Sequence, residues 1–406
     1  MLNPEQLASL RFGMSQVPEL GGEPGLFEER LAQWLVEQSF FRDFVYRNAK
    51  GKKKGDQLVD AIVLFGDVML LVEVKAQIGS AQRDDWVRDR LTKAVSQIEK
   101  TYRILKDRKI SKLVNDFYGE LDFDPDRYPN VFGIVILAHN SEPYEAASLV
   151  PELSASPFPM HVFTLDDFRL IASRFDTAGD MITFLELRTD ITNLVRLYVQ
   201  DESGNIQHML PQMRAVLGRY LSTNSPETLD KSYSSFTKKA TGELLQSPDW
   251  KYGLVIDDII ARAHDVDPDL PWNQHGPDTA ALEVSKFLGW LTRDRRINLG
   301  KKALEHCDLA KDGNDYYFYH FHPSRGTVFV FRASSESRHD RVAYLQYLVS
   351  YAQMKHGASS GLGVATEPIG DGRSYDFIVA HTYPPVEIIE SIKRFGDPFS
   401  DNLKPL

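Results

Sequence analysis

The sequence predicts a mixed chain, with an α/β N-terminal part in the element order αβββαβ and a separate C-terminal α+β domain. A short amphipathic helix precedes two strongly apolar strands that only two residues separate. A long helical segment and another buried strand follow, and a second set of helices and strands begins beyond residue 271. We therefore expect three regions: an N-terminal domain over 1–190, a mostly helical connection over 191–270, and a C-terminal domain over 271–406.

The N-terminal elements follow from hydrophobic spacing and from turn residues. Apolar residues at helical spacing predict the first helix, and runs of four to eight apolar residues between polar breaks predict the strands. In chain order we expect a helix at 27–35, strands at 58–65 and 68–75, a long helix at 84–109, strands at 131–138 and 161–164, and a helix at 165–175.

The hairpin at 58–75 brings charged residues together. Gly66-Asp67 is a two-residue connection, and Gly at its first position favours a type II′ turn. Counting outward from this turn makes Asp60 and Glu73 cross-strand neighbours, with Lys75 two residues further along the same face. Facing carboxylates are unfavourable, so this pair calls for cations.

One ammonium group balances only one of the two carboxylates. This leaves room for a divalent ion held by oxygen ligands, as Mg²⁺ usually is, from Asp60, Glu73 and the backbone carbonyl of Val74. The alternative is an ordinary ion pair on an edge hairpin that needs no metal.

An Asp followed, on the next strand, by Glu-x-Lys resembles the active-site signature of the PD-(D/E)xK nuclease superfamily. The resemblance covers about the first third of the chain, and it implies a restriction-endonuclease-like fold with Asp60, Glu73 and Lys75 as catalytic residues. It also implies Mg²⁺, with Mn²⁺ as a substitute, and an acidic metal ligand on the first helix, for which Glu28 is the first choice and Glu29 the reserve.

Some branches of this superfamily place a helical Gln four residues before a Tyr. Gln97 on the long helix matches the Gln and is a further catalytic candidate, but Thr101 stands where the Tyr is expected. The superfamily also contains members that have lost catalysis, so a non-catalytic scaffold remains the alternative.

Charge supports a polyanionic partner at this end of the chain. The whole chain has 47 Lys and Arg against 57 Asp and Glu, yet residues 42–109 hold 16 basic and 10 acidic residues. Lys52, Lys53 and Lys54 lie just before the first hairpin strand, and Lys93 lies on the long helix; we expect these four to contact phosphates. The alternative for the lysine run is a solvated loop.

The C-terminal part carries weaker signals. His320 and His322 alternate on one strand and could ligate zinc with His306 or Cys307, although buried structural histidines explain them as well. A basic stretch could clamp nucleic acid or form an exposed helix face; it consists of Arg293, Arg295, Arg296, Lys301 and Lys302.

Cys307 is the single cysteine, which excludes disulfides within the chain and favours a cytoplasmic location. The sequence predicts no secretory signal and no membrane span. We expect a Mg²⁺-dependent phosphodiesterase, either an endo- or an exodeoxyribonuclease, that acts in restriction, repair or anti-phage defence. A homodimer or a higher homo-oligomer is a possible assembly. RNA is the lesser alternative substrate, and a nucleic-acid- or protein-binding scaffold is the alternative function.

Overall fold

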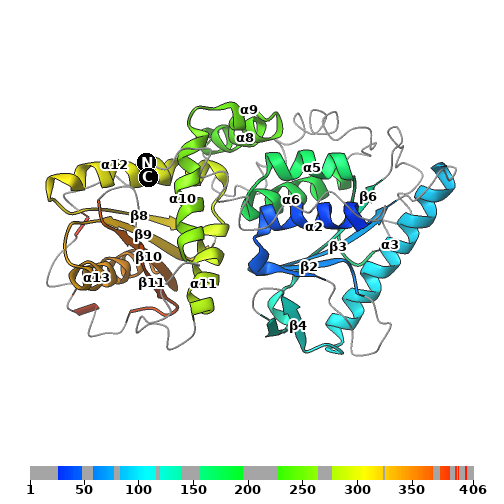
Figure 1. Ribbon diagram of the computed structural model, residues 1–406, viewed down its shortest axis with the longest axis horizontal. Coiled ribbons are helices and arrows are strands. Elements are labelled where there is room, and N and C mark those ends of the chain that lie inside the picture. The colour runs from blue at the N-terminus through cyan, green and yellow to red at the C-terminus, as the bar shows by residue number, and fades with distance from the viewer. Residues whose placement is uncertain are drawn as a thin grey trace. The chain divides into compact units, whose positions relative to one another are not determined.

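The structure is a computed structural model. It describes residues 26–47, 58–76, 83–115, 119–138, 156–194, 226–263, 277–322, 325–368, 375–384, 389–390, 392 and 398–399. The chain divides into two compact units, Phe12–Pro248 and Asp249–Leu406 (Figure 1). Both units combine helices with a mixed sheet, as the sequence predicts for a mixed α and β chain. No helix within the described residues is both long and apolar enough to cross a membrane.

A five-stranded mixed sheet forms the centre of the first unit, in the order β1-β2-β3-β6-β7. The first three strands pair antiparallel, and β6 and β7 continue the sheet parallel to β3. Their bounds are β1 Val45–Arg47, β2 Ala61–Phe65, β3 Val68–Ala76, β6 Asn130–Ala138 and β7 Met160–Thr164. β3 lies in the middle of the sheet, and its first seven residues are buried.

The hairpin of β2 and β3 has the predicted register. Phe65 pairs with Val68 and Ala61 pairs with Val72. Gly66 has a φ of 62° while Asp67 has no positive φ, as a type II′ turn requires. The next position outward from Ala61 and Val72 places Asp60 beside Glu73.

Helices cover both faces of this sheet (Figure 1). α3 (Arg83–Lys106) packs through Val87, Leu91 and Ile98 on the face that carries Ile62 and Leu71. The other face holds α2, α5 and α6 with aromatic contacts, such as that of Phe163 with Phe168 and Phe184. The bounds of these helices are α2 Leu26–Phe40, α5 Leu165–Arg174 and α6 Ala178–Leu194.

A small hairpin between α3 and β6 is an addition that the sequence reasoning did not predict. It consists of β4 (Lys112–Asn115) and β5 (Gly119–Asp122). The amide of Asn115 donates to the carbonyl oxygens of Arg42 (2.8 Å) and Val45 (2.9 Å), which fixes the hairpin beside the start of β1. Short 3₁₀ helices lie at η1 Arg42–Phe44, η2 Pro125–Arg127 and η5 Ala310–Asp312.

Helices α8 (Pro226–Ala240) and α9 (Glu243–Gln246) belong to the first unit. The ring of Phe236 packs on Phe175 with centroids 5.1 Å apart, and the buried Lys239 Nζ lies 2.8 Å from Asp180 Oδ1. By contrast, α10 (Trp250–Ala263) belongs to the second unit. The described part of 191–270 is thus shared between the two units.

The second unit has three layers around a four-stranded sheet in the order β11-β10-β9-β8 (Figure 1). Parallel β9 and β10 are joined through α13, which covers one face, and α10, α11 and α12 lie on the other. Gly361 and Gly363 face α13, where an added Cβ would come within 2.8 Å of Val349. The remaining bounds are β8 Tyr316–His322, β9 Thr327–Ala333, β10 Ser360–Thr366, β11 Tyr375–Ala380, α11 Pro277–Gly289, α12 Arg293–Leu309 and α13 Arg338–His356.

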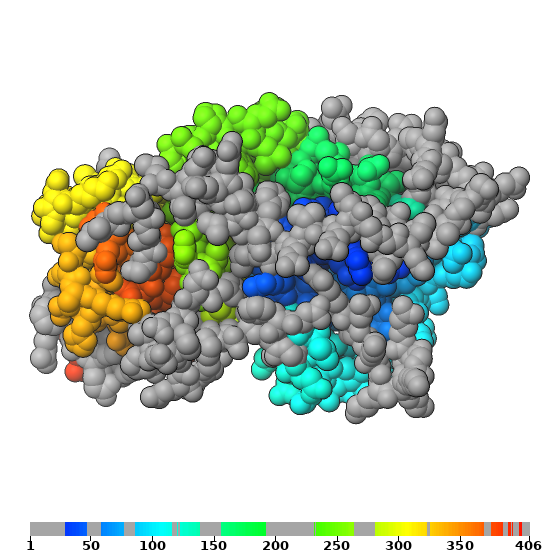
Figure 2. Space-filling model, in the orientation of Figure 1, coloured from blue at the N-terminus to red at the C-terminus, as the bar shows by residue number. Residues whose placement is uncertain are grey.

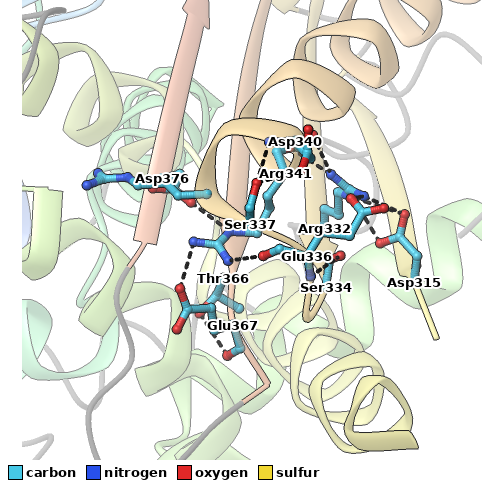
Figure 3. Close-up of polar contacts among 11 residues, drawn as sticks. Asp315, Arg332, Ser334, Glu336, Ser337, Asp340, Arg341, Thr366, Glu367 and Asp376 are labelled. Carbon is cyan, nitrogen blue, oxygen red and sulfur yellow. Dashed lines mark hydrogen bonds and ion pairs between the residues drawn. The ribbon is translucent and has the colours of Figure 1, made fainter. Parts of the chain in front are cut away.

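Buried arginines in this unit are paired with carboxylates. Figure 3 shows Arg332 bound to Asp315 and Glu336, and Arg341 bound to Asp376 and Glu367. In a second cluster, Arg293 and Arg296 share one carboxylate of α10, that of Asp257. Two members of the basic stretch, Arg293 and Arg296, are therefore buried and hold α12 to α10, so these two neither clamp nucleic acid nor lie on an exposed helix face.

Candidate active site

Asp60, Glu73 and Lys75 come together at one end of the β2–β3 hairpin. The backbone N–H of Val74 donates to Asp60 Oδ2 over 2.8 Å, and Lys75 Nζ donates to Glu73 Oε1. Strand alternation puts the three side chains on the sheet face that α3 covers, in line with Ile62 and Leu71. The predicted constellation is thus assembled by the hairpin register alone.

Both carboxylates are buried. Asp60 is 7% exposed and Glu73 is 4% exposed, whereas the Lys75 side chain is 24% exposed. Loss of hydration raises the pKa of Asp60 although the Val74 N–H and Lys75 oppose this rise. The pKa of Glu73 rises to about 7, because burial and the neighbouring charge of Asp60 outweigh Lys75. One lysine does not neutralise the pair.

Glu73 also leaves one oxygen without a partner. Its Oε2 is buried and accepts no hydrogen bond from any described residue. A buried carboxylate oxygen without a donor costs free energy. Oxygen donors are the ligands that Mg²⁺ prefers, so this atom, Asp60 and the Val74 carbonyl fit a hard divalent cation. Oδ2 of Asp60, however, already accepts a hydrogen bond from the Val74 N–H.

Two further residues fix the backbone around Asp60. Gln33 of α2 donates through Nε2 to the carbonyl oxygen of Asp60 (3.2 Å). The N–H of Val59 donates to Oγ1 of the fully buried Thr101 on α3 (3.3 Å). Sequence reasoning missed both roles. Thr101, noted only as a departure from the family pattern, is the acceptor that joins α3 to the residue before Asp60.

The structure separates the two candidates on α3. Gln97 is half-buried and lies one helical turn before Thr101, so it occupies the same side of the helix as this contact. Lys93 is exposed and pairs with Asp89 of the same helix (2.8 Å). Lys93 is therefore turned to solvent, whereas Gln97 is partly covered.

α2 carries the two acidic candidates Glu28 and Glu29. The side chain of Glu28 lies outside the described residues, while Glu29 is half-buried. Phe40 contacts Phe65 at the turn end of the hairpin (centroids 6.2 Å apart), and Gln33 contacts Asp60, so the helix runs towards the carboxylates in the direction of its N-terminus. Glu29 precedes Gln33 by four residues and shares its face. The choice between Glu28 and Glu29 stays a prediction.

Other predicted ligands are not assembled in the described residues. No group of three or more His, Cys, Asp or Glu side chains there could hold a metal ion, which includes the zinc set considered around His320 and His322. The predicted phosphate contacts Lys52, Lys53 and Lys54 lie outside the described residues.

Comparisons with protein-family models, with curated proteins and with solved structures found no match to this chain. The functional argument therefore rests on the chemistry of the site. Two buried carboxylates, one of them with an oxygen that has no hydrogen-bond partner, lie beside Lys75, where β3 becomes partly exposed.

Proposed function

We propose that this protein is a Mg²⁺-dependent nuclease that hydrolyses phosphodiester bonds, with DNA as its substrate. The observation that carries the proposal is the buried pair Asp60 and Glu73, whose mutual repulsion Lys75 offsets only in part. Proteins rarely bury such groups uncompensated, and strongly perturbed carboxylates concentrate at catalytic sites.

Asp60, Glu73 and the carbonyl of Val74 would hold the ion. When bound, Mg²⁺ polarises a phosphate oxygen and lowers the pKa of water, so that a nucleophile is available near neutral pH. Lys75 is the one part of the group with measurable exposure, and its ammonium can stabilise negative charge that develops on the phosphate. The Val74 N–H, Gln33 and Thr101 keep Asp60 in place.

The order of elements supports the resemblance to PD-(D/E)xK nucleases. The first unit contains, in chain order, a helix, a three-strand antiparallel meander, a long helix and a strand parallel to the third, with the β4–β5 hairpin inserted before this last strand. This is the αβββαβ order that the family implies. The excess of basic residues over 42–109 supports a phosphate-bearing substrate in restriction, repair or anti-phage defence.

One observation favours the alternative, a non-catalytic scaffold. The described residues supply only two carboxylates at this place, and Lys75 already contacts one of them. In this alternative the domain binds nucleic acid or a protein, and Asp60, Glu73 and Lys75 form a structural ion cluster that needs no metal.

Cleavage assays distinguish the two. Linear, supercoiled and single-stranded DNA, with RNA for comparison, are incubated in Mg²⁺, Mn²⁺ or EDTA with wild type, Glu73→Gln and Glu120→Gln. Glu120 is an exposed β5 residue paired with Lys112 (3.2 Å), so its variant removes the same charge elsewhere in the unit. Metal-dependent products lost only in Glu73→Gln support the nuclease, and the substrate cut identifies its class. If no product forms with any substrate and wild type binds no Mn²⁺, the scaffold is correct.

A further inference from the structure

The hydrogen-bonded pairing of β2 with β3 ends just before the candidate active site. In a hairpin closed by a two-residue turn, every second pair of residues outward from the turn exchanges two backbone hydrogen bonds. Counted in this way, Ala61 and Val72 form such a pair, and they are the last partners of the ladder. Val59 and Val74 would form the next hydrogen-bonded pair, but the ladder does not include them.

Side chains accept from both N–H groups of this missing pair. The Val74 N–H donates to Oδ2 of Asp60 (2.8 Å), and the Val59 N–H donates to Oγ1 of Thr101 on α3 (3.3 Å). In a regular antiparallel ladder, the Val59 N–H would instead donate to the carbonyl oxygen of Val74. Thr101 therefore leaves that carbonyl without the donor that the ladder would supply.

Packing fixes the position of Thr101. Its side chain is fully buried, and so are those of Ile98 and Leu105, which lie about one turn before and after it. Residues three and four apart lie on the same side of a helix, so all three face the core together. The Thr101 hydroxyl cannot turn away from Val59 without moving two core side chains. The buried N–H thus has a fixed acceptor that comes from a helix and not from the neighbouring strand.

Gln33 acts in the same way on the other side of Asp60. The pairing of β1 with β2 ends at Arg47 and Ala61. Backbone groups alternate in direction along a strand, so the carbonyl of Asp60 points towards the β1 side, and Gln33 donates to it (3.2 Å). The main chain around Asp60 is therefore held by the side chains of Gln33, Thr101 and Asp60 itself where strand pairing ends.

We propose that Thr101 is a positioning residue of the metal site, which frees the carbonyl oxygen of Val74 to bind the divalent cation. This inference rests on the function proposed above, in which Asp60, Glu73 and that carbonyl hold the ion. Carbonyl oxygens are suitable ligands for hard cations, and the groups that orient such ligands affect metal affinity strongly. Without the Thr101 hydroxyl, the Val59 N–H loses its acceptor and competes with the cation for the carbonyl.

Mn²⁺ binding to the full chain, followed by the electron paramagnetic resonance of the free ion, tests the proposal. Thr101→Val keeps the shape of the side chain but removes the acceptor, and we expect its affinity to be roughly tenfold lower than that of wild type. Thr101→Ser keeps the hydroxyl and should restore most of the affinity. Thr92→Val is the matched control, because the Thr92 hydroxyl donates to the Arg88 carbonyl (2.8 Å) on the exposed side of α3 (light blue in Figure 2).

Lys239→Met separates positioning from a general loss of stability. Lys239 pairs with Asp180 where α8 meets α6, so its replacement destabilises the same unit at a different contact. The folded Lys239→Met protein should bind Mn²⁺ as wild type does. If it binds Mn²⁺ as weakly as Thr101→Val, or if Thr101→Ser does not restore the affinity, the role of Thr101 is structural and the proposal is wrong.

A carbonyl signal reports on the proposed ligand directly. Val74-Lys75 is the one Val-Lys dipeptide in the sequence, so ¹³C′-valine with ¹⁵N-lysine labelling gives a single correlation for the Val74 carbonyl. We expect Mg²⁺ to shift this signal in wild type and in Thr101→Ser. In Thr101→Val the signal should differ from wild type even without Mg²⁺, because the Val59 N–H now competes for the carbonyl.

The outcomes distinguish this inference from the proposed function. If wild type binds Mn²⁺ but Mg²⁺ leaves the Val74 signal unshifted, the carbonyl is not a ligand and the inference alone is wrong. Equal Mn²⁺ affinity in wild type and Thr101→Val would also refute the inference alone. If wild type binds neither ion, the inference and the proposed nuclease are both wrong.

Discussion

Replacing Glu73 by Gln should stabilise the metal-free first unit at alkaline pH. The variant keeps the size of the side chain and an oxygen that accepts from Lys75, but it removes the charge facing Asp60. The folded pKa of Glu73, about 7, lies above its ordinary value of 4.5. The folded state therefore binds this proton more tightly than the unfolded state does. The contribution of the proton to the free energy of unfolding is fully present below about pH 4.5 and is lost as the pH rises through 7.

The size of the effect follows from the same values. Between pH 5 and pH 8, the ionisation of Glu73 should lower the free energy of unfolding of the wild type by about 2–3 kcal/mol. This is less than the full pKa difference implies, because the unfolded state is already partly ionised at pH 5. The Glu73→Gln variant has no such ionisation at this position, so the stability difference between the two proteins should grow by this amount.

Hydrogen exchange of the β3 amides measures this difference locally, which avoids treating a chain of two units as a two-state system. Comparing variant and wild type at one pH cancels the intrinsic effect of pH on exchange. With EDTA present, wild type should exchange faster relative to Glu73→Gln as the pH rises. The ratio of the wild-type rate to the variant rate should increase on the order of a hundredfold between pH 5 and pH 8. Glu120→Gln should show no such change. If this ratio of rates does not change with pH, the claim that burial and Asp60 raise the pKa of Glu73 is wrong.

Further predictions concern the supports of the site and the fold. Mg²⁺ should slow hydrogen exchange of the β3 amides at pH 8 in wild type but not in Asp60→Asn. Binding of Mg²⁺ near pH 7 should also release protons from Glu73, which calorimetry in buffers of different ionisation enthalpy measures. Thr101→Val should cost about 1–3 kcal/mol in denaturant unfolding by leaving a buried N–H unpaired, while Thr92→Val, at an exposed hydroxyl of the same helix, should cost little. Glu29→Gln should weaken Mn²⁺ binding in titrations; unchanged affinity would remove it as a ligand. Lys239→Met should destabilise the α8–α6 contact by about 3–5 kcal/mol, seen as faster exchange in both helices, because Asp180 stays buried.

The hairpin was predictable because local rules determine it. A two-residue turn beginning with Gly fixes the register, and strand alternation then fixes which side chains share a face. Asp60, Glu73 and Lys75 could thus be brought together without knowledge of any distant contact. The long helix and the β6 strand were predictable for a similar reason, since each is a single uninterrupted periodic pattern.

The contacts that complete the site depend on packing between distant elements. Gln33 and Thr101 reach the Asp60 region across 27 and 42 residues, and no local pattern encodes such a meeting. The choice between Glu28 and Glu29 depends on the rotation of α2, which the sequence alone does not fix. Likewise, the burial of Arg293 and Arg296 depended on Asp257, which lies on another helix.

Buried charged clusters in this chain differ in whether opposite charges balance them, and this difference separates stabilising clusters from candidate functional ones. Arg332 and Arg341 are fully buried, yet each is matched by carboxylates (Figure 3). Asp60 and Glu73 share one lysine. A fold that pairs charges so consistently elsewhere gains nothing in stability from this exception. Its cost is understandable if the pair awaits a ligand of opposite charge, the divalent cation proposed above.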